Sequence, residues 1–125
     1  MVRILSDITT IIVAIEALGI MCLEVWGTQT KVAQRAFNLS AEYLKQEEAQ
    51  LSMANQGLYN GFIGVGILIV RFGFPTVAVY PGLLLFIGFV VVAAIFGALT
   101  VTKKIILTQG MPAMLALILL VINEM

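Results

Sequence analysis

The chain contains no histidine and only one cysteine, Cys22, and both scarcities narrow the chemistry it can perform. Without histidine it cannot hold haem, zinc or non-haem iron through imidazole nitrogens, nor use a histidine base in catalysis. One cysteine permits no disulfide within the chain. Because no cofactor motif occurs either, we expect no bound cofactor.

Charge is equally scarce. Asp, Glu, Lys and Arg make up 11% of the 125 residues, and the formal net charge is zero, whereas a soluble domain has roughly a quarter of its residues charged. No basic run is present, so we expect no nucleic acid partner. Hydrophobic residues instead reach 61%. That is more than the core of so small a domain can bury, and we therefore expect a lipid bilayer to surround the chain.

Four apolar stretches are long enough to cross a bilayer as helices, at about residues 4–26, 49–71, 77–101 and 105–123. The sequence therefore predicts an all-α polytopic membrane protein, a single domain over 1–125, whose four transmembrane helices form an antiparallel bundle. Glu16 interrupts the first stretch and no small-residue cleavage site precedes Trp26, which favours a retained helix over a signal peptide. Asp7, near the outer boundary, is expected to be solvated, and Pro112 predicts a kink in the last helix.

The only extended hydrophilic stretch, Gly27–Glu48, holds six of the fourteen charged residues. Its pattern is typical of a short amphipathic connector lying on a membrane surface, although a plain solvated loop is the alternative. Loops 27–48 and 102–104 carry five Lys and Arg residues, against two, Arg3 and Arg71, on the other side. The positive-inside rule therefore predicts a plasma-membrane protein with both loops in the cytoplasm and both termini outside.

The second span carries an unusual set of polar side chains on one helix face. At about 100° per residue they share an arc of about 140°, while Gly57, Gly61 and Gly64 lie on the opposite side. The polar residues are Asn55, Gln56, Tyr59 and Asn60.

Counting inward from the cytoplasmic helix ends places Glu16 of the first span level with Tyr59 and Asn60. Gln109 of the fourth span lies nearer the cytoplasmic surface, and Glu24, close to the interface, could reach water. An ionisable side chain at bilayer depth costs about 3 kcal/mol or more unless it is paired or hydrated. We therefore predict an intramembrane polar pocket centred on Glu16, with the ligand-binding residues Glu16, Glu24, Asn55, Gln56, Tyr59, Asn60 and Gln109.

Three functions fit such a pocket. The first is binding or transport of a small amphipathic or cationic ligand, with Glu16 as its counter-ion. Four helices are few to enclose a transport path, so this function implies a homo-oligomer. Its subunits could meet through the small residues Ala93 and Gly97, or Gly57 and Gly61.

The second function is a membrane enzyme acting on a lipid or isoprenoid, with Glu16 and Glu24 as acid and base. The two carboxylates differ by about 12 Å in height, too far for one proton relay unless the helix bends or water intervenes. The third is a non-catalytic assembly partner, in which the polar face binds another membrane protein. For Asn55, Asn60 and Gln109 themselves, a purely structural role in interhelical hydrogen bonds is the alternative. Whether the protein is an enzyme stays open at this point.

Three motifs at these positions point to one family. They are Glu16-x7-Glu24 with Ile20-Met21, the run Asn55-Gln56-Gly57-Leu58-Tyr59-Asn60-Gly61, and Lys103-Lys104-Ile105-Ile106-Leu107-Thr108-Gln109-Gly110 before Pro112. Over nearly its whole length the chain resembles the domain-of-unknown-function 1304 family of small four-helix membrane proteins. The resemblance implies that architecture and no established activity.

Overall fold

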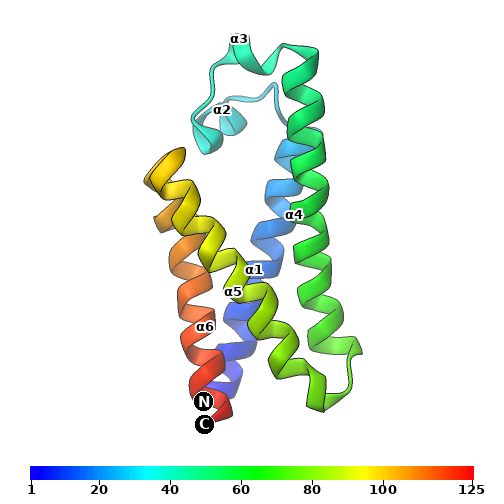
Figure 1. Cartoon of the computed structure of the whole chain (residues 1–125), viewed down its shortest axis with the longest axis vertical. Helices are drawn as coiled ribbons and strands as arrows, with labels where there is room; N and C mark the ends of the chain where they lie inside the picture. Colours follow the sequence, from blue (N-terminus) through cyan, green and yellow to red (C-terminus); the bar gives the residue numbers. More distant parts are fainter.

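The computed structural model describes all 125 residues, which form helices and no strands. Three long helices, α1 (Val2–Val25), α4 (Glu47–Gly73) and α5 (Thr76–Thr100), are followed by the π-helical turn η1 (Ile106–Gly110), which continues into α6 (Met111–Glu124). The four resulting rods are each long and apolar enough to cross a membrane, which confirms the predicted all-helical fold. Figure 1 shows the chain rising along α1, descending α4, rising along α5 and descending α6, so that both termini lie at one end.

The connector between α1 and α4 contains two short helices, α2 (Lys31–Phe37) and α3 (Ala41–Leu44). Each begins at a side-chain cap, because the hydroxyls of Thr30 and Ser40 accept hydrogen bonds from the backbone N–H groups of Ala33 and Tyr43, three residues further on. Ala33 and Leu44 are fully buried, and Gln29 Nε2 donates to the Leu44 carbonyl at 2.6 Å. The connector is therefore packed on the end of the bundle.

The glycine face of α4, formed by Gly57, Gly61 and Gly64, packs directly on α1. A methyl group added to Gly64 would lie 2.8 Å from the Ala14 carbonyl oxygen, and one added to Gly61 would overlap the Met21 sulfur. Small residues allow helix backbones to approach this closely. The suggestion that Gly57 and Gly61 contact a second copy of the chain is therefore wrong, because α1 already covers them.

Of the small residues of α5, Gly97 is covered within the chain and Ala93 is not. An added methyl group on Gly97 would lie 3.0 Å from the Ile105 side chain, whereas Ala93 is exposed and lines the small cavity described below. Contact between two copies through Ala93 and Gly97 stays a prediction.

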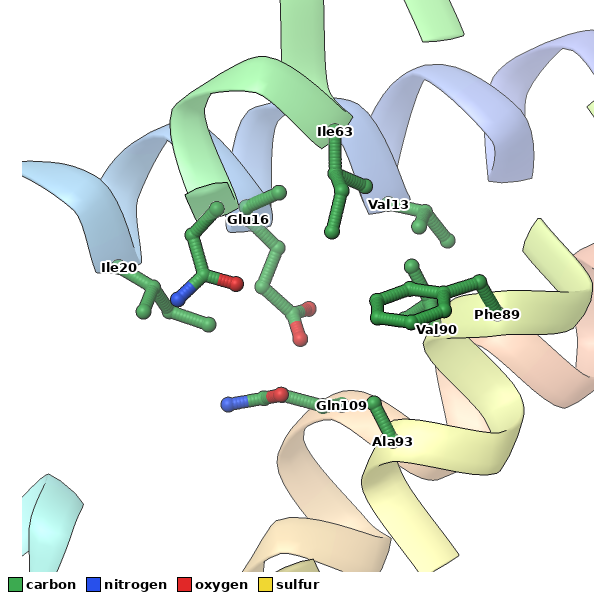
Figure 2. A pocket seen from close by; sticks show the side chains of 10 residues that line it. Val13, Glu16, Ile20, Ile63, Phe89, Val90, Ala93 and Gln109 are labelled. Carbon is green, nitrogen blue, oxygen red and sulfur yellow. The ribbon is translucent and has the colours of Figure 1, made fainter. Parts of the chain in front are cut away.

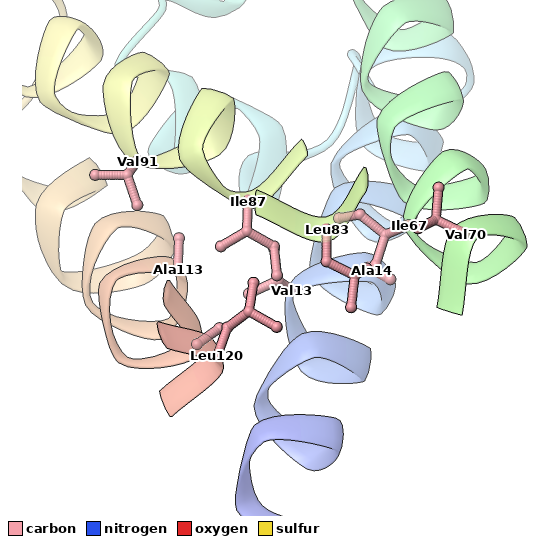
Figure 3. Close-up of a cluster of buried hydrophobic side chains, with 10 residues drawn as sticks. Val13, Ala14, Ile67, Val70, Leu83, Ile87, Val91, Ala113 and Leu120 are labelled. Atoms are coloured by element: carbon pink, nitrogen blue, oxygen red, sulfur yellow. The ribbon is translucent and has the colours of Figure 1, made fainter. Parts of the chain in front are cut away.

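A tight apolar core joins all four rods from the middle of the bundle toward the termini. Figure 3 shows side chains from α1, α4, α5 and α6 meeting there. Its buried members are Val13, Ala14, Ile67, Val70, Leu83, Ile87, Val91, Ala113, Ala116 and Leu120. The interior of this half of the bundle is consequently filled by side chains.

Beyond the core, near the termini, Arg71 forms an ion pair with Asp7. The Nε and Nη2 atoms of Arg71 donate to the two carboxylate oxygens of Asp7, each at 2.7 Å. From the sequence we expected Asp7 to be solvated, but it is paired with Arg71. The prediction failed because α4 continues through Arg71 to Gly73, so that the guanidinium reaches α1 as part of a helix.

The kink expected at Pro112 takes the form of the π-helical turn. Met111 N–H donates to the carbonyl of Ile106, five residues earlier, and Pro112 then occupies the first turn of α6, where it needs no N–H donor. Such turns are rare and often lie at functional sites. This one carries Gln109.

At the connector end the bundle opens. Figure 1 shows α5 slanting away from α4 toward η1 and α6, with the connector lying above the space between them. The small cavity around Glu16 and the two cavities that adjoin it lie in this half.

Candidate functional site

Glu16 lies at the centre of the open half. Its half-buried side chain projects from α1 toward Gln109 (Figure 2), and it makes no hydrogen bond or ion pair with another protein group. Glu16, Asn60 and Gln109 line one small cavity of about 30 Å³, which has room for about one water molecule. The remaining lining is apolar and includes Ile20 and Ile63. The structure thus brings an unpaired acid and two amides from three helices to one place.

Glu24, two turns along α1, is the most deeply buried acid in the chain, with 1% of its surface exposed. Its Oε1 accepts a hydrogen bond of 2.8 Å from Asn60 Nδ2, while its Oε2 is buried with no partner. The sequence allowed Glu24 to reach water at the interface, but its side chain is buried and does not do so. A buried carboxyl oxygen without a donor is costly, which indicates that Oε2 either carries a proton or meets a group that enters from outside.

Two larger cavities adjoin the small one and share Ile20 and Gln109 with it. One of about 400 Å³ lies beneath the connector and reaches Glu24, and the other, of about 510 Å³, lies between α1, α2 and η1 and reaches Glu16. Ala36 and Phe37 of α2 line both. We call these three adjoining cavities the chamber.

A groove of about 540 Å³ runs along the outer side of the chamber between α4 and α5. It shares Asn60, Ile63, Phe89 and Ala93 with the small cavity, so its inner end meets the polar groups. Toward the surface its walls are mainly aromatic and aliphatic, with Phe62, Leu85 and Phe86 added to Ile63 and Phe89. We call this the α4–α5 groove.

Only part of the amide face of α4 lies toward Glu16. The prediction that all four of its polar residues line the pocket is therefore wrong. Asn55 is exposed and lines neither the chamber nor the groove, and Tyr59, 66% exposed, lies at the outer rim of the groove. Gln56 lines both the groove and the chamber. Only Asn60 reaches an acid. The cause is the packing of the glycine face on α1, which turns the opposite face of α4 outward.

Two residues of the chamber were missed by the sequence reasoning. Arg35 of α2 and Lys104, just before η1, line the same cavity as Glu16 and Gln109. In the sequence, Lys104 marks only the end of an apolar span, and Arg35 is one of several charged residues in a hydrophilic connector. Neither pattern indicates a place in a binding site. Their place at the chamber depends on how α2 packs on the bundle, which no local pattern specifies.

A second polar cleft, of about 420 Å³, lies at the opposite end of the bundle around the Asp7–Arg71 ion pair. It also contains Arg3, Asn123 and Glu124, close to the two termini. The apolar core separates it from the chamber. Both carboxylate oxygens of Asp7 are already engaged by Arg71, and the other acid, Glu124, is exposed at the end of α6. The cleft therefore holds no half-buried, unpaired acid like Glu16.

Comparison with known proteins identifies relatives without adding an activity. The chain is 43% identical over 115 residues to the uncharacterised protein YpaA of Lactococcus lactis subsp. lactis, which covers 92% of this chain and 95% of that protein. No solved structure matches it. A family model matches residues 11–121, which include every residue of the chamber, and the chain therefore belongs to the family described as protein of unknown function (DUF1304).

Proposed function

We propose that this protein binds a small amphipathic molecule whose cationic or hydrogen-bond-donating head occupies the chamber at Glu16. The observation that carries the proposal is an acid at bilayer depth that faces a cavity instead of a partner within the chain. An ionisable group in that position is costly unless something pairs with it. A protonated amine or hydroxyl entering the cavity would supply the missing partner.

The surrounding amides suit such a head. Gln109 and Asn60 line the cavity with Glu16, and each offers a carbonyl oxygen to a donor and an NH₂ group to an acceptor. Gln56 adds a further amide where the groove enters. Buried polar groups fix the orientation of a ligand, while apolar walls provide most of the contact area.

The apolar part of the ligand would lie in the α4–α5 groove, whose aromatic side chains include Phe62, Phe86 and Phe89. Because the groove opens on the surface that faces lipid, an amphiphile dissolved in the bilayer would enter sideways. Its apolar chain would leave contacts with lipid and contact the groove walls, while its head would leave water at the interface and pair with Glu16.

Location and assembly are parts of the same proposal. On the distribution of Lys and Arg, we infer that the protein lies in the plasma membrane with the connector and loop 102–104 in the cytoplasm. Transport, as distinct from binding, would need a homo-oligomer, because four helices are few to surround a path across the bilayer.

The experiment measures binding of radiolabelled octylamine, which is cationic at neutral pH, to the protein in phosphatidylcholine nanodiscs, with empty nanodiscs as background. We expect Glu16→Gln to weaken binding by about 10- to 100-fold, the equivalent of one charge-assisted hydrogen bond. Glu48→Gln removes an exposed acid from the first turn of α4 and serves as the control. Octylamine binding that is unchanged in Glu16→Gln would refute the proposal.

A further inference from the structure

Two cations, Arg35 and Lys104, face the same cavity as Glu16, and neither is paired with a carboxylate. The cavity of about 510 Å³ between α1, α2 and η1 contains all three side chains together with Gln109. The only ion pair in the chain joins Arg71 to Asp7 at the far end. This part of the chamber, which we call the basic mouth, therefore holds one acid and two cations.

The backbones that carry these cations are fixed. Arg35 lies on α2, whose first turn is capped by Thr30 and which is anchored by the fully buried Ala33. Lys104 precedes η1, and its carbonyl accepts a hydrogen bond of 3.1 Å from the Thr108 hydroxyl. The two positive charges thus belong to the wall of the cavity that also holds Glu16, and they come from two different segments of the chain.

This charge balance limits what the ligand can be. Both cations are exposed. If a purely cationic head neutralised Glu16, they would still repel that head, because all three side chains line one cavity. A head that carried an anionic group as well as a cationic one would pair with Glu16 through its cation and with Arg35 and Lys104 through its anion. The inference rests on the proposed function and specifies its ligand further.

The arrangement also sets the order of groups along the ligand. The α4–α5 groove adjoins the small cavity, Glu16 and Gln109 line that cavity, and both also line the basic mouth. We propose that the ligand is a zwitterionic amphiphile in which an ammonium group follows the apolar chain and a carboxylate or phosphate follows the ammonium. Arg35 and Lys104 would bind that terminal anion.

The test compares octylamine with N-octyl-β-alanine, which has the same octyl chain, a secondary in place of a primary ammonium, and in addition a terminal carboxylate. We expect the unmodified protein, in nanodiscs of phosphatidylcholine alone, to bind N-octyl-β-alanine at least tenfold more tightly than octylamine. In the double variant Arg35→Gln/Lys104→Gln, the ratio of the two affinities should fall to about one. Octylamine itself should bind that variant as well as before, or better, because the repulsion is gone.

The matched control is Lys31→Gln/Lys103→Gln. It removes one cation from α2 and one from the loop before η1, but neither residue lines the basic mouth. We expect this variant to keep the ratio of the unmodified protein. An equal loss in both double variants would mean that the preference arises from general surface charge or from lipid headgroups gathered at it, and would overturn the inference.

The outcomes separate the two proposals. If the unmodified protein binds both compounds with equal affinity and Glu16→Gln weakens both, the proposed function stands and the zwitterion inference is wrong. If neither compound binds, or if Glu16→Gln changes neither affinity, the proposed function itself fails.

Discussion

Replacing Gly64 by alanine tests whether the glycine face of α4 determines how α1 and α4 pack. The added methyl carbon would lie 2.8 Å from the Ala14 carbonyl oxygen and 2.8 Å from Leu18 Cγ. A carbonyl oxygen within a helix cannot move aside as a side chain can. The two helices must therefore separate along the interface that also holds Glu24 against Asn60.

The expected loss follows from two opposing contributions. Overpacking a tight interface costs about 1–3 kcal/mol, while alanine gains about 0.5–1 kcal/mol over glycine within a helix. The net loss then lies between 0 and about 2.5 kcal/mol. Because the carbonyl oxygen cannot give way, we expect Gly64→Ala to lower the free energy of unfolding by about 1–2 kcal/mol. Gly61→Ala should cost less, because its methyl group meets only the flexible side chain of Met21.

The measurement is reversible unfolding by sodium dodecyl sulfate in mixed micelles, followed by helical circular dichroism and by the fluorescence of Trp26, which ends α1. The control is Gly88→Ala in α5, where an added methyl group meets nothing within 4 Å. It should leave stability unchanged or slightly raised. Equal stability of Gly64→Ala and Gly88→Ala would show that the close approach of α1 and α4 does not govern the fold.

Two further predictions concern the hydrogen bond at Glu24 and the orientation in the membrane. Asn60→Leu removes the only donor to the Glu24 carboxylate, and we expect it to cost about 1–3 kcal/mol in the same unfolding assay. Asn55→Leu, on the exposed side of α4, should cost little, and equal effects would contradict the role assigned to Asn60. A cysteine introduced at Ser40, in a chain whose native cysteine is replaced, should resist a membrane-impermeant maleimide in intact cells and react after permeabilisation. Labelling in intact cells would reverse the proposed orientation.

Helix number and the depth of polar groups could be predicted from the sequence because both depend on backbone geometry alone. In lipid every backbone polar group must be paired within its own helix, so an apolar run of about 20 residues can only be a spanning helix. The constant rise of 1.5 Å per residue then gives the height of each side chain. For that reason Glu16, Asn60 and Gln109, from three different spans, do line one cavity.

The basic mouth could not be predicted in the same way. The connector sequence shows which residues are polar, but α2 has only 7 residues, and its position depends on tertiary contacts. Ala33 and Leu44 are buried at the bundle end, and Gln29, in the loop between α1 and α2, donates a hydrogen bond to the Leu44 carbonyl of α3. Only this packing brings Arg35 over Glu16.

Rotation of α4 about its axis decides which amides belong to the site, and the glycines determine it. Taking Gly57 as zero at about 100° per residue, Asn60 lies at about −60° and Gln56 at about −100°, while Asn55 and Tyr59 lie on the far side at about 160° and 200°. Once α1 covers the glycine face, only the flank at −60° can reach Glu24, which is where Asn60 donates its hydrogen bond. Close packing of backbones outweighs the placement of amides, because a void or a separated interface loses contacts along the whole helix. The polar site is therefore the flank of the glycine face, and the remaining amides face the groove or the outer surface.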